Sequence, residues 1–225
     1  QVLAIVLVMA SGIATYLMSI ANLDSLTATR TRFYLEYGFA DVFAGLKRAP
    51  LSVGDEIAAI DGVGTEDLGI QAPMRIRLAG FDDPVRGLLL SLPDVGPKPL
   101  NRLYLRAGRL PEPYAQQEIV LGEAFATAHG IEPGGELTAV VAGRMETYRV
   151  VGIAISPEYV YQIQSGAAFP DFERFAIAWI GRRALEAAYG MDGAFNSVAL
   201  SLAPGAQAER VIERLDPILE PWGGL

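Results

Sequence analysis

The first 23 residues of the chain carry no charged side chain, and this feature constrains the sequence more than any other. Residues Val2–Ala21 form a nearly continuous apolar run, and the first charge is Asp24. A helix of about 20 such residues, rising about 1.5 Å each, matches a hydrocarbon core about 30 Å thick. The alternative is a signal peptide cleaved after Ser19-Ile20-Ala21, but the apolar part of a signal peptide is usually only about 7–15 residues long. We therefore expect residues 1–23 to form a transmembrane helix.

The helical pattern is expected to continue beyond this run. Leu26, Phe33 and Tyr37 keep a helical spacing, and neither glycine nor proline occurs between Asp24 and Gly38. A helix that continues out of a membrane into an aqueous domain would couple the two mechanically.

Composition excludes several classes of function. The formal net charge is −8 and no basic stripe is present, so a nucleic-acid interface is not expected. The chain has no cysteine, which excludes disulfides and thiolate metal sites. With His129 as the only histidine, a multi-histidine zinc site is excluded as well, whereas a carboxylate-only metal site remains open. We predict no cofactor bound by this chain.

Beyond Tyr37 the sequence alternates strand-like and helix-like segments, which predicts an α+β fold. The expected strands cover residues 39–46, 70–78, 85–92, 118–121, 137–142, 147–155, 174–180 and 197–202, and the expected helices cover residues 51–60, 122–129, 182–189 and 206–219.

A stretch rich in proline and glycine, Pro93–Pro99, indicates a change of region. The simplest organisation is a two-lobed extracytoplasmic domain. One α+β lobe next to the membrane would combine residues 24–96 and 166–225, and a β-rich lobe of residues 97–165 would be inserted between these two arms.

No catalytic motif is present. The sequence contains neither a nucleotide-binding Gly-x-x-x-x-Gly-Lys-Ser/Thr loop nor a Gly-x-Ser-x-Gly elbow. Ser156 precedes a proline and is interpreted as a turn residue. His129 falls at the end of a predicted helix, where capping is the favoured role because no nucleophile pairs with it.

Two acidic pairs are the remaining candidates for acid–base chemistry. They are Asp82-Asp83 and Asp171 with Glu173, and each flanks a turn-forming segment. A solvated loop is the favoured interpretation of both pairs, and a carboxylate-dependent hydrolase is the alternative. No catalytic, cofactor-binding or metal-binding residue is therefore predicted.

An aromatic run lies between two of the predicted strands and comprises Tyr159, Tyr161, Phe169, Phe172, Phe175 and Trp179. Aromatic side chains on a loop can bind a partner or an apolar ligand, but they can also form the core between two lobes. The core interpretation is favoured, and partner contact stays open for Tyr159, Tyr161, Phe169 and Phe172.

Several segments together suggest a family. A Gly-Arg-x-Pro element is followed by EIVLGEAFA and, after a Pro-Gly turn, by a hairpin that ends in VVGI. In this order and spacing, the segments resemble the MacB-like periplasmic core domain of FtsX-like ABC transporter permeases. The resemblance covers nearly the whole chain and is carried by FADVFAGLKRAP (39–50), IAAIDGV (57–63), LNRLYLRAGRLPEP (100–113), EIVLGEAFATAHGIEPGGEL (118–137) and GRMETYRVVGIAISPEYVY (143–161).

This resemblance implies a non-catalytic permease subunit of the bacterial inner membrane with its main domain in the periplasm. It implies that ATP is bound by a separate cytoplasmic ABC ATPase subunit or domain, that the permease is a dimer, and that a periplasmic adaptor, a lipid, a lipoprotein, a peptide or a protein is the partner. A membrane-anchored binding or scaffold domain that needs no ATPase is the alternative.

Overall fold

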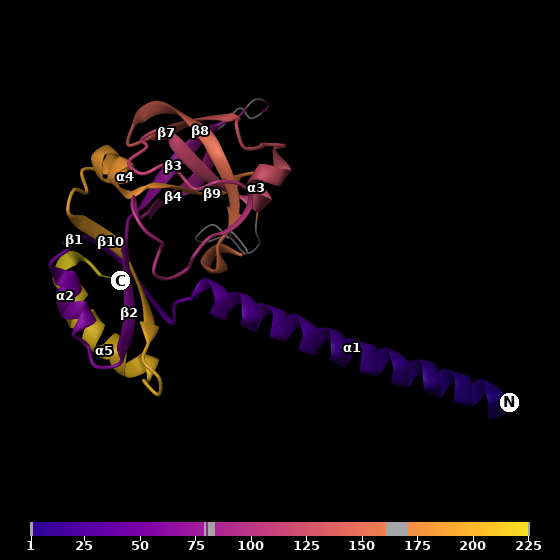
Figure 1. The fold of residues 1–225 in the computed structure, drawn as a ribbon. Helices are drawn as coiled ribbons and strands as arrows, with labels where there is room; N and C mark the ends of the chain where they lie inside the picture. Colours follow the sequence, from indigo (N-terminus) through magenta and orange to yellow (C-terminus); the bar gives the residue numbers. More distant parts are fainter. Residues whose placement is uncertain (1, 79, 81–83, 161–170, 225) are drawn as a thin grey trace. The chain divides into compact units, whose positions relative to one another are not determined.

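The computed structural model describes residues 2–78, 80, 84–160 and 171–224 (Figure 1). The chain divides into two compact units, Gln1–Tyr37 and Gly38–Leu225. In chain order the elements are α1 (Val2–Tyr37), β1 (Val42–Pro50), α2 (Val53–Ala58), β2 (Val63–Gly69), β3 (Gln71–Arg77), β4 (Val85–Leu92), β5 (Tyr104–Gly108), β6 (Glu118–Gly122), α3 (Glu123–Ala128), β7 (Glu136–Val141), β8 (Arg144–Ile155), a 3₁₀ turn (Pro157–Tyr159), β9 (Phe175–Gly181), α4 (Arg182–Tyr189), β10 (Ala194–Leu202), α5 (Ala208–Leu219) and a second 3₁₀ turn (Glu220–Trp222).

The first unit consists of helix α1, whose predicted continuation to Tyr37 is confirmed. Within it the hydroxyl of Thr15 donates to the carbonyl of Ser11 over 2.9 Å, and Thr29 bonds to Ser25 in the same way over 2.8 Å. Over the part of the chain that the structure describes, no helix combines the length and the apolar character needed to cross a membrane. The transmembrane role predicted for residues 1–23 is therefore not confirmed.

The second unit contains a small antiparallel sheet in the order β1-β10-β2. Helices α2 and α5 cover it side by side (Figure 1). In α5 the buried residues Val211, Leu215 and Leu219 recur every four positions, so one face of the helix is apolar and packs against the strands. Ile57 of α2 and Phe195 of β10 are fully buried in the same core.

The larger sheet has seven strands in the order β5-β8-β6-β9-β4-β3-β7, and an additional pairing between β8 and β7 closes it on itself. Closure is possible because β8 has 12 residues. Its first part pairs with β7, and its second part pairs with β6 on one side and β5 on the other.

The interior of this closed sheet is apolar. Strand β3 alternates buried and exposed residues, which places Ala72, Met74 and Ile76 on the inner face. Strand β9 is buried along nearly its whole length, as expected for a strand covered on both faces. Inside, the helix α3 contributes the fully buried Phe125. On the outer face, Trp179 packs with neighbouring strands in a separate cluster.

The predicted hairpin is confirmed as β7 and β8. The strands are joined by Ala142 and Gly143, whose φ angles are +49° and +80°. Two central residues with positive φ are characteristic of the tight turn whose twist matches that of the two strands.

The α+β class is confirmed, and the four helices predicted between residues 51 and 219 are present, α4 with the predicted ends and the other three with shifted ends. Strands β2 and β5 were not predicted. The predicted boundaries at 96/97 and 165/166 do not separate the two sheets, because β3, β4 and β9, which were assigned to the arms, belong to the same sheet as β6, β7 and β8. Strand β9 lies between β6 and β4, so the chain's arms and its middle segment build the larger sheet together.

Candidate functional site

The two sheets meet where the chain passes from β2 into β3. The crossing residue, Ile70, is buried, with only 1% of its surface exposed. Its backbone N–H donates to the hydroxyl of Ser91 over 2.9 Å, and the backbone N–H of Ser91 donates to the carbonyl of Ile70 over 3.0 Å. Ser91 of β4 therefore satisfies both backbone groups of the crossing residue, which a buried chain crossing requires.

A pair of side-chain amides joins β3 to β10. The backbone N–H of Gln71 donates to Oδ1 of Asn196, and Nδ2 of Asn196 donates to the carbonyl of Gln71, both over 2.8 Å. Nε2 of Gln71 also donates to the hydroxyl of Ser197 over 2.9 Å. The first residue of the larger sheet is thus hydrogen-bonded to two successive residues of the smaller one.

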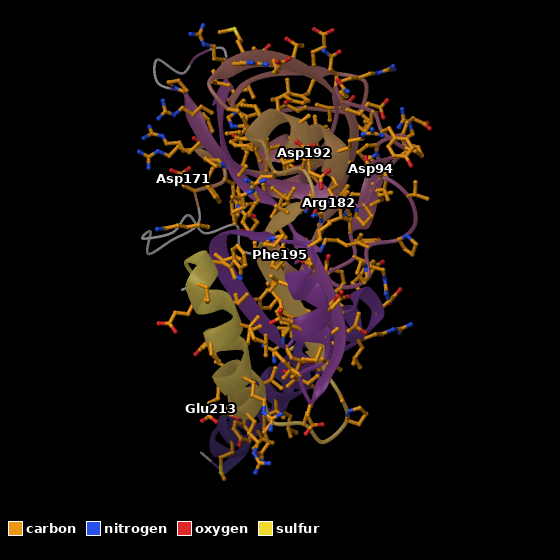
Figure 2. All side chains as sticks on the ribbon, turned by 90° about the vertical axis from the view of Figure 1, so that its left-hand side faces the viewer. Asp94, Asp171, Arg182, Asp192, Phe195 and Glu213 are labelled. Carbon is orange, nitrogen blue, oxygen red and sulfur yellow. The ribbon has the colours of Figure 1, made fainter. Side chains whose placement is uncertain are left out.

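Arg182, the first residue of α4, makes a second connection between the sheets. Its Nη1 donates to the carbonyl of Leu68 in β2 over 2.5 Å, and its Nη2 donates to the carbonyl of Ala194 in β10 over 2.7 Å. Nε completes the set by donating to Glu186 over 2.8 Å. The planar guanidinium suits this arrangement because its donors project in fixed directions. Figure 2 shows Arg182 close to Phe195, at the level where the smaller sheet begins.

The segment between β4 and β5 makes a third connection. Lys98 forms an ion pair with Asp67 of β2 and donates to the carbonyl of Leu100 over 3.2 Å. Both charged side chains are largely buried, with 15% and 11% of their surface exposed. A pair shielded from water in this way is screened less by salt than one on the surface.

Asn101 extends this third connection to the start of the second unit. The residue is 1% exposed and has a φ of +50°, a conformation that asparagine tolerates better than most residues. Its backbone N–H donates to Gly38 over 2.7 Å, its Oδ1 accepts from the backbone N–H of Ala40 over 3.1 Å, and its Nδ2 donates to Glu158 over 3.3 Å.

Glu158 is the ionisable group that this arrangement perturbs. Burial raises the pKa of its carboxyl, although a hydrogen bond with Tyr159 and the charge of Lys98 act in the opposite direction. Burial likewise raises the pKa of the Tyr159 hydroxyl, which accepts a hydrogen bond from Gln71 over 3.2 Å.

An open groove of about 410 Å³ lies beside this network. Such a volume is within the range of about 300–1,000 Å³ that is common for small-molecule sites. The rings of Phe39 and Phe43 contact each other along one wall, with 5.5 Å between their centroids. The full lining comprises Phe39, Phe43, Ala44, Gly45, Gln71, Glu158, Tyr159 and Ser197.

Of the four aromatic residues considered as partner contacts, two can be placed. Tyr159 is half-buried, packs against the outer cluster around Trp179 and also lines the groove. Phe172 is exposed over 37% of its surface. Tyr161 and Phe169 lie outside the described residues, and partner contact by the four aromatics stays a prediction.

The other residues singled out from the sequence have local structural roles. His129 is the C-terminal cap of α3, as predicted, and its Nε2 lies 2.9 Å from the carbonyl of Glu173. Ser156 accepts the backbone N–H of Glu158 over 3.2 Å and so begins the following turn. Asp171 likewise accepts the backbone N–H of Arg174 over 3.1 Å.

Both members of the second acidic pair, Asp171 and Glu173, are exposed. The first pair, Asp82-Asp83, lies outside the described residues. Among the residues that the structure describes, no three acidic or histidine side chains gather as metal ligands would.

Sequence patterns did not indicate the residues of the junction. Gln71, Asn196 and Arg182 each stand at or near the end of a strand or helix, where polar residues are common and carry no special signal. One weak signal exists, because Asn196-Ser197 stands between two buried apolar runs of β10, Ala194-Phe195 before it and residues 198–200 after it. A polar pair inside a buried strand requires partners, and here Gln71 supplies them.

Comparison with known proteins shows similarity in structure but not in sequence. No protein-family model matches the chain, and no curated protein is significantly similar to it in sequence. Its structure is similar to that of the extracellular domain of the noncanonic ABC-type transporter YknZ from Gram-positive bacteria, with a TM-score of 0.50, 12% identity, and coverage of 79% of this chain and 88% of the other.

The periplasmic region of MacB from Actinobacillus actinomycetemcomitans is also similar, with a TM-score of 0.47, 10% identity, and coverage of 81% of this chain and 86% of the other. The likeness to the YknZ domain is in line with the expected resemblance to the extracytoplasmic domains of ABC transporters. The chain therefore has a fold similar to that of the extracellular domain of an ABC-type transporter.

Proposed function

We propose that this chain forms the extracytoplasmic part of an ABC transporter permease subunit and transmits ATP-driven conformational change to a lipid, lipoprotein, peptide or protein partner. The observation that carries the proposal is the likeness to the YknZ domain, which extends over 88% of that domain. ATP would be bound by a cytoplasmic ABC ATPase subunit. The permease would act as a dimer in the bacterial inner membrane, where an adaptor could join it on the periplasmic side.

The junction between the two sheets supports this role. A domain that transmits a displacement must not absorb it, so its parts must keep a fixed orientation. Hydrogen bonds are directional, whereas apolar contacts are not. The bonds made by Gln71, Arg182 and Asn101 therefore resist rotation of one sheet against the other more effectively than an apolar interface of the same size.

The proposal is tested by purifying the full-length protein from its native membrane and measuring ATP turnover. We expect an ATP-hydrolysing subunit to copurify. We also expect its turnover to change when Arg182→Ala loosens the junction, and to stay the same in the control Arg210→Ala, which alters an exposed residue of α5. A scaffold domain predicts no copurifying ATPase, and that result would refute the proposal.

A further inference from the structure

The groove beside the junction combines aromatic walls with a carboxylate. Phe39 and Phe43 form one wall, and Tyr159 and Glu158 also line the groove. Phe43 has 43% of its surface exposed, so its ring is open to a ligand. Glu158 and Tyr159 also bond to Asn101 and Gln71 of the junction, whereas the ring of Phe43 takes no part in those hydrogen bonds.

The charge beside the groove is negative. Glu158 is influenced by two charged groups, Lys98 and Asp67. Lys98 is already paired with Asp67, so these two charges largely cancel. The carboxyl of Glu158 has hydrogen bonds with two neutral groups, Nδ2 of Asn101 and the hydroxyl of Tyr159. The negative charge of Glu158 therefore has no full counterion among the described groups that act on it.

We propose that this groove binds a small organic cation with a quaternary ammonium group. Such a cation is weakly hydrated and is attracted to the faces of aromatic rings, and a nearby carboxylate adds a direct charge attraction. A metal ion would suit the groove less well, because hard cations require several oxygen ligands. The aromatic rings of Phe39, Phe43 and Tyr159 would surround the methyl groups, and Glu158 would balance the charge.

The direct test is calorimetric titration of the full chain, kept in a neutral maltoside detergent, with choline and with 3,3-dimethyl-1-butanol. The second compound has the same shape but no charge. We expect choline to bind at least about 10-fold more tightly, since only the charged compound is attracted by the aromatic faces and by the carboxylate of Glu158. Equal affinity for the two compounds, or no binding of choline, would overturn the proposal.

Two variants test whether Glu158 and Phe43 contribute to choline binding. We expect Glu158→Gln to weaken choline binding about 10-fold and Phe43→Ala to weaken it about 3-fold, consistent with the strength of charge and ring contacts at a partly exposed site. Phe43 is exposed, so its truncation leaves the core intact and gives a result even if the Glu158 variant folds poorly. The control Asp171→Asn removes an exposed carboxylate elsewhere and should change nothing. Choline affinity that is unchanged in both groove variants would refute the assignment.

A second experiment decides whether the ammonium group belongs to a lipid headgroup or to a free solute. If the chain also sediments with phosphatidylcholine vesicles and choline displaces it, the ligand is a lipid headgroup. If choline binds and vesicles do not, the ligand is a free solute. Neither readout involves ATP turnover, so failure of this site and failure of the proposed transport role are distinguishable.

Discussion

The interior of the larger sheet and the junction between the two sheets are both buried, but different forces hold them. The interior is lined by apolar side chains such as Phe125, Ile76 and Leu121. The junction is held by hydrogen bonds and an ion pair, through residues such as Gln71 and Arg182. Apolar burial contributes most to stability, while directional bonds define geometry.

This contrast indicates how the molecule divides its tasks. Closure of the larger sheet secures a stable body, because close packing tolerates little rearrangement. The junction instead specifies how that body is oriented with respect to the smaller sheet. Variants in the interior should therefore mainly lower the free energy of unfolding, whereas variants in the junction should cost less stability and change the orientation of the two sheets.

The largest effect is expected from truncation in the interior. Phe125 is fully buried, so Phe125→Ala should lower the free energy of unfolding by about 3–5 kcal/mol, through lost apolar burial and the cavity left behind. Urea denaturation measures this change. The matched control Phe43→Ala, at an exposed ring, should cost less than about 1 kcal/mol. A similar loss of unfolding free energy in the two variants would contradict the claim that the interior of the larger sheet carries most of the stability.

A smaller effect is expected from Arg182→Ala at the junction. The substitution leaves the carbonyls of Leu68 and Ala194 without their charged donor, and such bonds contribute about 1.5–3 kcal/mol. Denaturation should show a loss within that range, and Arg210→Ala on the surface of α5 should stay within about 0.5 kcal/mol of the parent. If Arg182→Ala left the free energy of unfolding unchanged, water would be replacing the hydrogen bonds of the guanidinium, and the junction would not contribute to stability as proposed.

A still smaller effect is expected from Tyr159→Phe. The change removes the hydroxyl that accepts from Gln71 and keeps the ring in its cluster, so the loss should be about 1 kcal/mol. Tyr114→Phe, at a ring with 54% of its surface exposed, is the control and should be neutral. If Tyr159→Phe is also neutral, Gln71 is held by its other partners alone.

The last prediction compares the pH dependence of two glutamates. Burial raises the pKa of Glu158, so between the ordinary glutamate pKa and the raised pKa the folded state holds a proton that the unfolded state has released. Over that pH range, the contribution of Glu158 to stability therefore falls as the pH rises. A hydrogen bond from Arg109 lowers the pKa of Glu118. The ionised Glu118 therefore stabilises the fold at pH values above the ordinary glutamate pKa, and this contribution is lost as the pH falls through the lowered pKa.

Stability measured from about pH 3 to pH 8 should therefore separate the two residues. Relative to the parent, Glu158→Gln should gain stability with rising pH and Glu118→Gln should lose it. Changes of the same sign in both variants would contradict the assigned environments.

Much of the local structure could be predicted from the sequence, but the junction could not. Helices α3, α4 and α5 follow from short-range periodicity and from the glycine or proline that ends each one. Strand β2 was missed because its centre, Thr65-Glu66-Asp67, is polar. A strand with such a centre does not show the apolar alternation on which strand prediction relies.

Long-range pairing explains the remaining errors. Strand β9 inserts between β6 and β4, and nothing in its own residues specifies those neighbours. The contacts of the junction join residues as far apart as Gln71 with Asn196 and Leu68 with Arg182, 125 and 114 positions apart. Because no local pattern links such residues, the groove beside them was equally invisible, although Tyr159 was singled out as an aromatic of interest.

The most direct test of the central claim is the distance between the two sheets in solution. The chain has no cysteine, so spin labels can be placed at Glu213→Cys on α5 (Figure 2) and at Met145→Cys, an exposed residue of β8. If the junction fixes the orientation, pulsed electron paramagnetic resonance will give one narrow distance distribution, and adding Arg182→Ala and Gln71→Ala will broaden it. A distribution that is already as broad without these two substitutions would contradict the claim.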